Sequence, residues 1–273
     1  MTTTGNTLAN DNFIYGYYLN ENGYGEKITS LEHLDKTKKY WLHFDYTLNR
    51  TQEWFENHSQ LNPVIINALL NEETRPRATP LHYGVLLSLR GVNLAPDSNP
   101  EDMVSMRVWF TQDQVITTRH RVLLSAKDIA HDLDEGNGPT SPAQLVVLLT
   151  ERLISRMANT INEIEEQVSV IEESILISSS FDLRNDIADL RRKIISLRRY
   201  FSPQKEAMLQ LLNEKITLFS NEEKIQLRET ADHLTRFIED LDSIKDRAAV
   251  TQEELSNRLA EQMNNRMYVL SIV

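Results

Sequence analysis

One stretch near the C-terminus governs the architecture of this chain: Leu227-Arg-Glu-Thr-Ala-Asp-His-Leu-Thr-Arg-Phe-Ile-Glu-Asp-Leu241. Apolar residues recur at every seventh position, at Leu227, Leu234, Leu241, Ala248 and Leu255. A second apolar position accompanies them, supplied by Ala231, Ile238 and Leu259 and interrupted by Lys245 and Gln252. This is a partial coiled-coil seam. It predicts a helix that is packed by its neighbours before Ala248 and faces a wetter environment after it.

The helix that carries this seam is expected to be very long. We expect it to begin at an Asn221 cap and to continue to Val273, about 80 Å at the α-helical rise. No domain of this size encloses such a rod, so much of it should meet partner chains or extend outward. The final stretch, Met267-Tyr-Val-Leu-Ser-Ile-Val273, is apolar and lacks a cap. We interpret it as the entry into a transmembrane helix; a tail tucked into a core is the alternative.

The two segments before this helix also have a helical pattern. Glycine is absent after Gly138, and Pro203 is the only proline after Pro142. We expect helices over residues 142–177 and 183–214, the second bent or restarted at Ser202-Pro203. The expected organisation is an α/β domain at 1–140, a helical hairpin packed on it at 141–220, and a stalk helix at 221–273.

The first half of the chain combines strand-like and helix-like runs. The strand-like runs are rich in Tyr, Val, Trp and Phe, at Phe13–Leu19, Tyr40–Tyr46, Tyr83–Leu89, Val104–Phe110 and Gln114–Arg119. The last two should form a hairpin. The helical patterns are Thr51–His58, Val64–Asn71 with Asn62 as N-cap and Pro63 at the first position, and Ser125–Leu133. The fold class is therefore α+β or α/β, with an α/β/α layer domain followed by long helices.

Composition excludes several functions. The chain has 273 residues with 40 acidic and 29 basic side chains, a net charge of −11. An acidic chain is poorly suited to nucleic acid, so we expect no nucleic-acid partner. The absence of cysteine removes disulfides, thiol catalysis and cysteine-based zinc sites. No phosphate-binding loop and no nucleophile–base motif is visible, so an enzyme is not expected.

The later part of the last helix carries a polar face. Residues at steps of three or four share it: Glu253, Asn257, Glu261, Asn264, Met267 and Ser271. Carboxylates come first, followed by amide, thioether and hydroxyl groups. A ring of such helices around an axis would make a path for cations. The alternative is an ordinary solvated helix face.

A basic cluster and one spaced pair are further candidates. The cluster contains Arg191, Arg192, Lys193, Arg198 and Arg199. We expect it to pair with acidic helices, for example at Glu163, Glu165, Glu166, Glu172 and Glu173; an anion patch is the alternative. Glu229 and His233 lie four residues apart, which is usable metal-ligand spacing. The alternative there is a surface histidine, with Asp232 pairing Arg236.

Two long-helix motifs resemble the CorA family of divalent-cation transporters. One is Asp189-Leu-Arg-Arg-Lys-Ile-Ile-Ser-Leu-Arg-Arg-Tyr-Phe-Ser-Pro-Gln-Lys-Glu206. The other joins Ala231-Asp-His-Leu-Thr-Arg-Phe-Ile-Glu-Asp-Leu-Asp242 to Gln262-Met-Asn-Asn-Arg-Met-Tyr-Val-Leu-Ser-Ile-Val273. In the first half, Leu89-Arg-Gly-Val-Asn-Leu94 and Pro100-Glu-Asp-Met-Val-Ser-Met-Arg-Val-Trp109 are similar to the ZntB branch of zinc transporters.

The resemblance implies a homopentamer whose cytosolic domains form a funnel into a membrane pore. It assigns the cytosolic pore entrance to Asn264, Met267, Leu270 and Ser271. It also implies a bacterial inner-membrane protein with this part in the cytoplasm. The Gly-x-Asn signature and both transmembrane helices of the family lie outside this sequence, so we expect a truncated chain.

The function expected from all of this is zinc transport, with Zn²⁺ as transported ion and no catalytic cofactor. The acidic funnel would gather cations and help to gate the pore. Direction stays open between proton-coupled uptake and efflux. Magnesium, cobalt or nickel transport by the same family is one alternative function. A soluble coiled-coil scaffold is the other.

Overall fold

The computed structural model describes residues 13–72, 75–96, 98–177 and 181–272. Its centre is one seven-stranded sheet in the order β2-β1-β3-β7-β6-β5-β4. The strands are β1 (Tyr15–Leu19), β2 (Gly25–Lys27), β3 (Tyr40–Asp45), β4 (Arg77–Leu81), β5 (Gly84–Gly91), β6 (Val104–Phe110) and β7 (Gln114–Arg119). Among the strands of the described residues, only β3 and β7 pair in parallel, with Leu42 opposite Ile116.

The predicted hairpin is confirmed, because β6 and β7 have the expected bounds and pair antiparallel. Two strands were not expected. β2 has three residues, and β4 contains Pro80. Both lie at the edges of the sheet, where short strands and proline are tolerated because no further strand needs their N–H groups.

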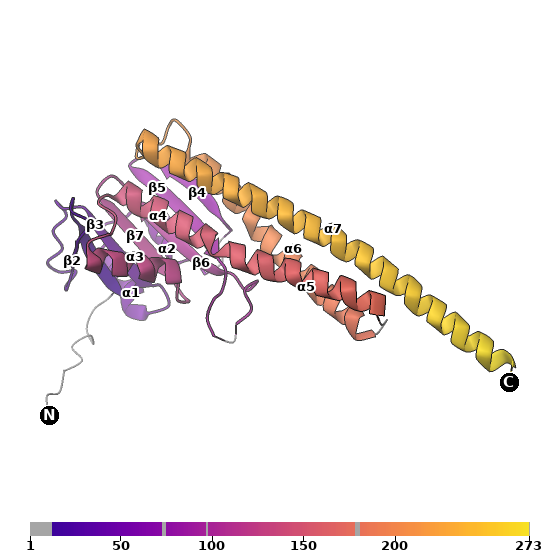
Figure 1. The fold of residues 1–273 in the computed structure, drawn as a ribbon. Helices are drawn as coiled ribbons and strands as arrows, with labels where there is room; N and C mark the ends of the chain where they lie inside the picture. The colour runs from indigo at the N-terminus through magenta and orange to yellow at the C-terminus, as the bar shows by residue number, and fades with distance from the viewer. Residues whose placement is uncertain (1–12, 73–74, 97, 178–180, 273) are drawn as a thin grey trace, which may run out of the picture.

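Helices cover both faces of the sheet, as the layered prediction required (Figure 1). The short helices α1 (Asn49–Asn57) and α2 (Pro63–Leu70) pack on one face around Phe44 and Phe55. On the other face lie α3 (Leu124–Glu135), α4 (Pro142–Ser155) and part of α6 (Phe181–Leu211). The predicted start of α2 is confirmed: the Asn62 side chain accepts a hydrogen bond from the Val64 N–H at 2.8 Å, and Pro63 is the first helical residue.

The prediction of one helix over residues 142–177 is wrong, because the helix breaks at Arg156. α4 packs against the sheet, whereas α5 (Met157–Ile177) leaves it and packs on α6 and α7. The Arg156 side chain pairs with Asp128 of α3 at this break. The change of packing partner between α4 and α5 explains the break.

Of the bend or restart predicted at Ser202-Pro203, the restart is wrong, since α6 continues through Pro203 to Leu211. The adjacent Gln204 is fully buried. Its amide accepts from the Arg90 N–H at 2.6 Å and donates to the Arg90 carbonyl at 3.0 Å. The pairing of β4 with β5 ends at Ser88, so Gln204 bonds to β5 just beyond the last residue that β4 covers. This two-way bond joins α6 to the sheet.

The last helix, α7, spans Asn221–Ile272. Its N-terminus is a capping box: the Ser220 hydroxyl accepts from the Glu223 N–H at 3.2 Å, and the Glu223 carboxylate accepts from the Ser220 N–H at 2.7 Å. The cap is therefore Ser220, not Asn221 as predicted. Each of the five seam residues is at most 1% exposed. Among the described residues, none of the helices is both long enough and apolar enough to cross a bilayer.

His43 is a buried titratable group in β3. Its ring stacks on Tyr15 at 4.8 Å, and Nδ1 lies 2.7 Å from the Thr117 hydroxyl. Burial, reinforced by the charge of Arg119, lowers the pKa of His43 to about 3. The side chain is therefore neutral and structural at physiological pH.

This burial predicts an acid-sensitive contribution to stability. Between about pH 6.5 and pH 3 the unfolded chain protonates His43 and the folded chain does not, so stability falls as the pH is lowered through that window. The loss should approach about 1.4 kcal/mol per pH unit. We expect His43→Asn to remove this part of the pH dependence in urea unfolding, and His58→Asn, at an exposed position, to retain it. If the free energy of unfolding changes with pH equally in both variants, His43 is not the source of this pH dependence.

Candidate functional site

The distal part of α7 presents an exposed face opposite its buried seam. The predicted ion-pathway residues all lie exposed: Glu253, Asn257, Glu261, Asn264, Met267 and Ser271. At 100° per residue they fall within a sector of about 120°, roughly opposite Ala248 and Leu255. Leu270, which the family resemblance added, is 77% exposed but lies about 100° away from Ser271.

The carboxylates on this face stand apart from the nearby basic side chains. Within the described part of the chain, neither Glu253 nor Glu261 takes part in an ion pair. Arg258 points the other way: it bonds Glu254 at 2.8 Å and the Ile175 carbonyl of α5 at 3.2 Å. The helical period also places Arg266 on the far side of α7. The face is thus acidic first and then neutral, with exposed apolar groups at its end.

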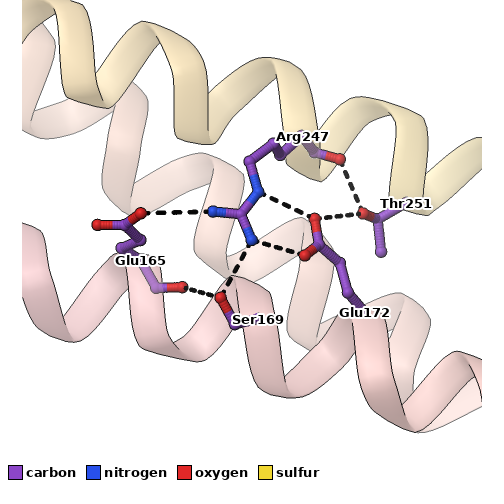
Figure 2. A network of polar contacts seen from close by, with 5 residues as sticks. All are labelled: Glu165, Ser169, Glu172, Arg247 and Thr251. Carbon is purple, nitrogen blue, oxygen red and sulfur yellow. Dashed lines mark hydrogen bonds and ion pairs between the residues drawn. The ribbon is translucent and has the colours of Figure 1, made fainter.

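A network centred on Arg247 joins α7 to α5 (Figure 2). The guanidinium bonds both carboxylate oxygens of Glu172, with Nε to Oε1 at 3.1 Å and Nη2 to Oε2 at 2.6 Å. Nη2 also donates to the Ser169 hydroxyl at 3.0 Å, and Nη1 lies 3.6 Å from Glu165. The Thr251 hydroxyl, one helical turn further along α7, lies 3.5 Å from Glu172.

Sequence reasoning missed Arg247 and assigned its acidic partners elsewhere. We expected Glu165 and Glu172 to pair with the basic cluster on α6, but the structure gives them to α7. One signal was present, since Arg247 directly precedes the seam residue Ala248 and therefore borders the packed face.

The α6 basic cluster divides between contacts with α7 and contacts within α6. Arg198 forms a two-point bond with Asp242 of α7, Nε to Oδ1 at 2.6 Å and Nη2 to Oδ2 at 2.9 Å. The Arg198 hydrogen bond is the main cause that lowers the pKa of Asp242. Arg191 hydrogen-bonds to Gln252 of α7. Both contacts hold α7 against α6.

The other three basic residues do not reach α7 in this way. Arg192 pairs with Asp189 one turn earlier in α6, and the Arg199 guanidinium lies 5.7 Å from the Tyr200 ring. Lys193 borders an open hollow between α5 and α6, beside Glu163, Glu166 and Asp186. Of the five predicted acidic partners, Glu163 and Glu166 share this hollow with Lys193.

Glu229 and His233 both lie exposed on the first part of α7. The His233 ring is 6.5 Å from that of Phe237. Over the described ranges, the structure contains no group of three or more His, Cys, Asp or Glu side chains able to hold a metal ion. This pair therefore offers two ligands at most from a single chain.

The sequence matches a family model described as CorA-like Mg²⁺ transporter protein over residues 36–273. It is 36% identical over 266 residues to the divalent cation transporter CmaX of Pseudomonas aeruginosa, covering 95% of this chain and 80% of that one. It is 31% identical over 269 residues to the zinc transport protein ZntB of Yersinia pseudotuberculosis serotype O:1b, covering 98% and 82% of the two chains.

Solved structures agree with this match. The structure of full-length CmaX superposes with a TM-score of 0.88 at 34% identity, covering 99% of this chain and 84% of that one. The crystal structure of the ZntB cytoplasmic domain from Vibrio parahaemolyticus gives a TM-score of 0.81 at 24% identity, covering 92% and 100%. Because its sequence identity is only 24%, the second match shows similarity of fold alone.

The geometry of the Arg247 network predicts a measurable coupling. Both side chains are about one-third exposed, so solvent screens the pair and the coupling between Arg247 and Glu172 should be about 0.5–1 kcal/mol. A double-mutant cycle with Arg247→Met and Glu172→Gln, read by urea unfolding, measures it. The matched control is a second cycle with Arg247→Met and Glu173→Gln. Glu173 has no bond to Arg247, so the coupling energy in that cycle should be near zero. Coupling that persists unchanged in 1 M salt would contradict an ionic origin.

Proposed function

The chain belongs to the CorA family of divalent-cation transporters, and we propose that it forms the cytoplasmic part of a zinc transporter of the bacterial inner membrane. Members of this family are transporters, not enzymes. We propose that five copies surround a central axis and that α7 of each copy lines the axis with its exposed face. The funnel made in this way gathers hydrated cations and leads them toward the membrane.

The exposed face of α7 is the observation that carries this proposal. As far as Leu259, one side of the helix is occupied by the seam and by Arg258, whereas Glu253 and Asn257 lie exposed on the other; from residue 260 onward the described part of the helix, with Glu261, is exposed all round. Carboxylates that line a confined path raise the local cation concentration. The neutral oxygens of Asn257, Asn264 and Ser271 then replace water ligands without trapping the ion, as passage requires.

The choice of zinc rests on the ZntB relatives and on the match across both halves of the chain. The second candidate is magnesium, cobalt or nickel, which the family description and the broader name of CmaX favour. Magnesium prefers oxygen ligands and retains water, whereas zinc readily takes nitrogen ligands. Competition between these ions for transport separates the two candidates. The same flux assay, with and without a proton gradient, separates uptake from efflux.

The arginine contacts support a role in gating. Arg198 and Arg247 hold α7 to α6 and α5 through carboxylates that are about one-third exposed. A cation bound near those carboxylates competes with the arginines and changes the packing between α7 and its neighbours. Cation binding can then shift the balance between two arrangements of the stalk.

The funnel predicts that charge reversal on the exposed face slows transport. We expect Glu253→Lys combined with Glu261→Lys to reduce zinc flux by the transporter in proteoliposomes about tenfold at low ionic strength, because attraction becomes repulsion. The reduction should shrink in high salt. The control pair Glu21→Lys and Glu135→Lys makes the same change in net charge on the α/β domain and should leave flux unchanged. If both pairs of substitutions reduced zinc flux equally, the proposed funnel would be contradicted.

The pentamer is tested by the mass of the chain in solution. We expect light scattering to give five times the chain mass of 31.6 kDa, with zinc and with a chelator alike. A pentamer that needs zinc would place metal ligands between subunits and bring Glu229 and His233 back into consideration. A monomer or dimer in both conditions would contradict self-assembly through this part of the protein.

A further inference from the structure

A hollow of about 420 Å³ lies at one edge of the sheet, away from the exposed face of α7. It is bordered by residues that follow β3 and β7, by the end of β5 and by the start of β6. The carboxyl ends of β3, β5 and β7 therefore meet there. The volume suits a small molecule.

A buried cation lies directly behind the wall of this hollow. The Arg107 side chain is fully buried, and its Nε and Nη1 have no hydrogen-bond partner among the described residues. Its Nη2 donates to the Glu72 carbonyl at 2.7 Å, and its guanidinium lies 4.2 Å from the Tyr46 ring. Glu72 and Tyr46 both line the hollow. A buried charge without an ionic partner is costly, so an anionic group in the hollow would offset part of that cost.

Hydrogen-bond donors converge on the same space. Arg90 is held in place by the Met103 carbonyl at 2.9 Å and by the Tyr200 ring at 4.7 Å. The side chains of Ser196 and Tyr200 border the hollow from α6. Ser196 and Tyr200 are half-buried, and their hydroxyl groups can donate hydrogen bonds to a carboxylate or a similar oxyanion.

Acidic groups border the hollow as well. Glu101 is half-buried, whereas Asp102 and Glu72 are exposed at its rim. Within the described ranges, neither Glu101 nor Asp102 is part of an ion pair, and the same holds for Arg121 on the rim. With both signs of charge around one space, a polyanion would be repelled. A molecule that carries both signs would satisfy both groups.

We propose that this hollow binds a small zwitterion of the amino-acid class. Its carboxylate bonds Arg121 at the rim, with Arg107 behind, and its ammonium group bonds Glu101 and Asp102. Because Ser196 and Tyr200 flank Arg198, which holds Asp242 of α7, the bound molecule also fixes α6 where α6 meets the long helix. The site is independent of the proposed ion path.

The test is thermal unfolding of the 273-residue chain with the protein L-amino acids, one at a time at about 10 mM. At least one should raise the melting temperature by about 2–4 °C. Acetate and methylammonium, each carrying one half of the zwitterion, should raise it much less. If acetate or inorganic phosphate raises the melting temperature as much as any amino acid does, the hollow is a simple anion site and the proposal of a zwitterionic ligand is wrong. No shift with any amino acid would overturn the site itself.

Two variants locate the effect. Glu101→Gln and Arg121→Gln should fold normally, since neither side chain is fully buried, and should each remove most of the ligand-induced shift. The matched controls Glu135→Gln and Arg228→Gln change exposed residues elsewhere and should retain it. Amide exchange over residues 196–204 should slow with the ligand in the unmodified chain. A shift retained in both hollow variants would mean binding elsewhere and would overturn the proposal.

Discussion

The burial of one apolar stripe on α7 is the constraint from which the rest of the helical structure follows. Leu227, Leu234 and Leu241 are completely buried against shorter helices, and each fully buried leucine contributes about 1.5–3 kcal/mol. α4, α5 and α6 all pack along this stripe (Figure 1). The stripe occupies only part of the circumference of α7. The opposite side of its packed portion is therefore exposed.

Apolar burial alone does not fix the register of long helices, because a stripe can slide by a heptad. Arginine contacts fix the register that the apolar stripe leaves open. Arg198 bonds Asp242, Arg247 bonds Glu172, and Arg258 bonds the carbonyl of Ile175. The guanidinium fork binds a carboxylate in one plane and at two points, which suits this role. The same contacts are half-exposed, so ions in solution can weaken them.

The sheet and the stalk are connected through α6. Gln204 bonds the main chain of Arg90, and Tyr200 packs against the Arg90 side chain. Tyr200 lies four positions after Ser196, and Arg198 between them holds α7. A change at the carboxyl edge of the sheet can therefore reach α7 through one turn of helix.

Local chemistry was enough to predict several elements from the amino-acid sequence. The bounds of β6 and β7 follow from β-branched and aromatic composition, and the Asn62 cap of α2 follows from an Asn-Pro pair at a helix start. The seam of α7 and its shared polar face follow from helical periods of 3.5 and 3.6 residues. The sequence did not predict three other features: the edge strands β2 and β4, the break at Arg156 and the partners of Arg247. Each depends on groups far apart in the sequence: a sheet edge that tolerates Pro80, a change of packing surface, and a carboxylate 75 residues away. Sequence periodicity placed Glu253 and Asn257 on one side of a helix, but only tertiary packing decided that this side would be exposed, because the seam and Arg258 occupy the other.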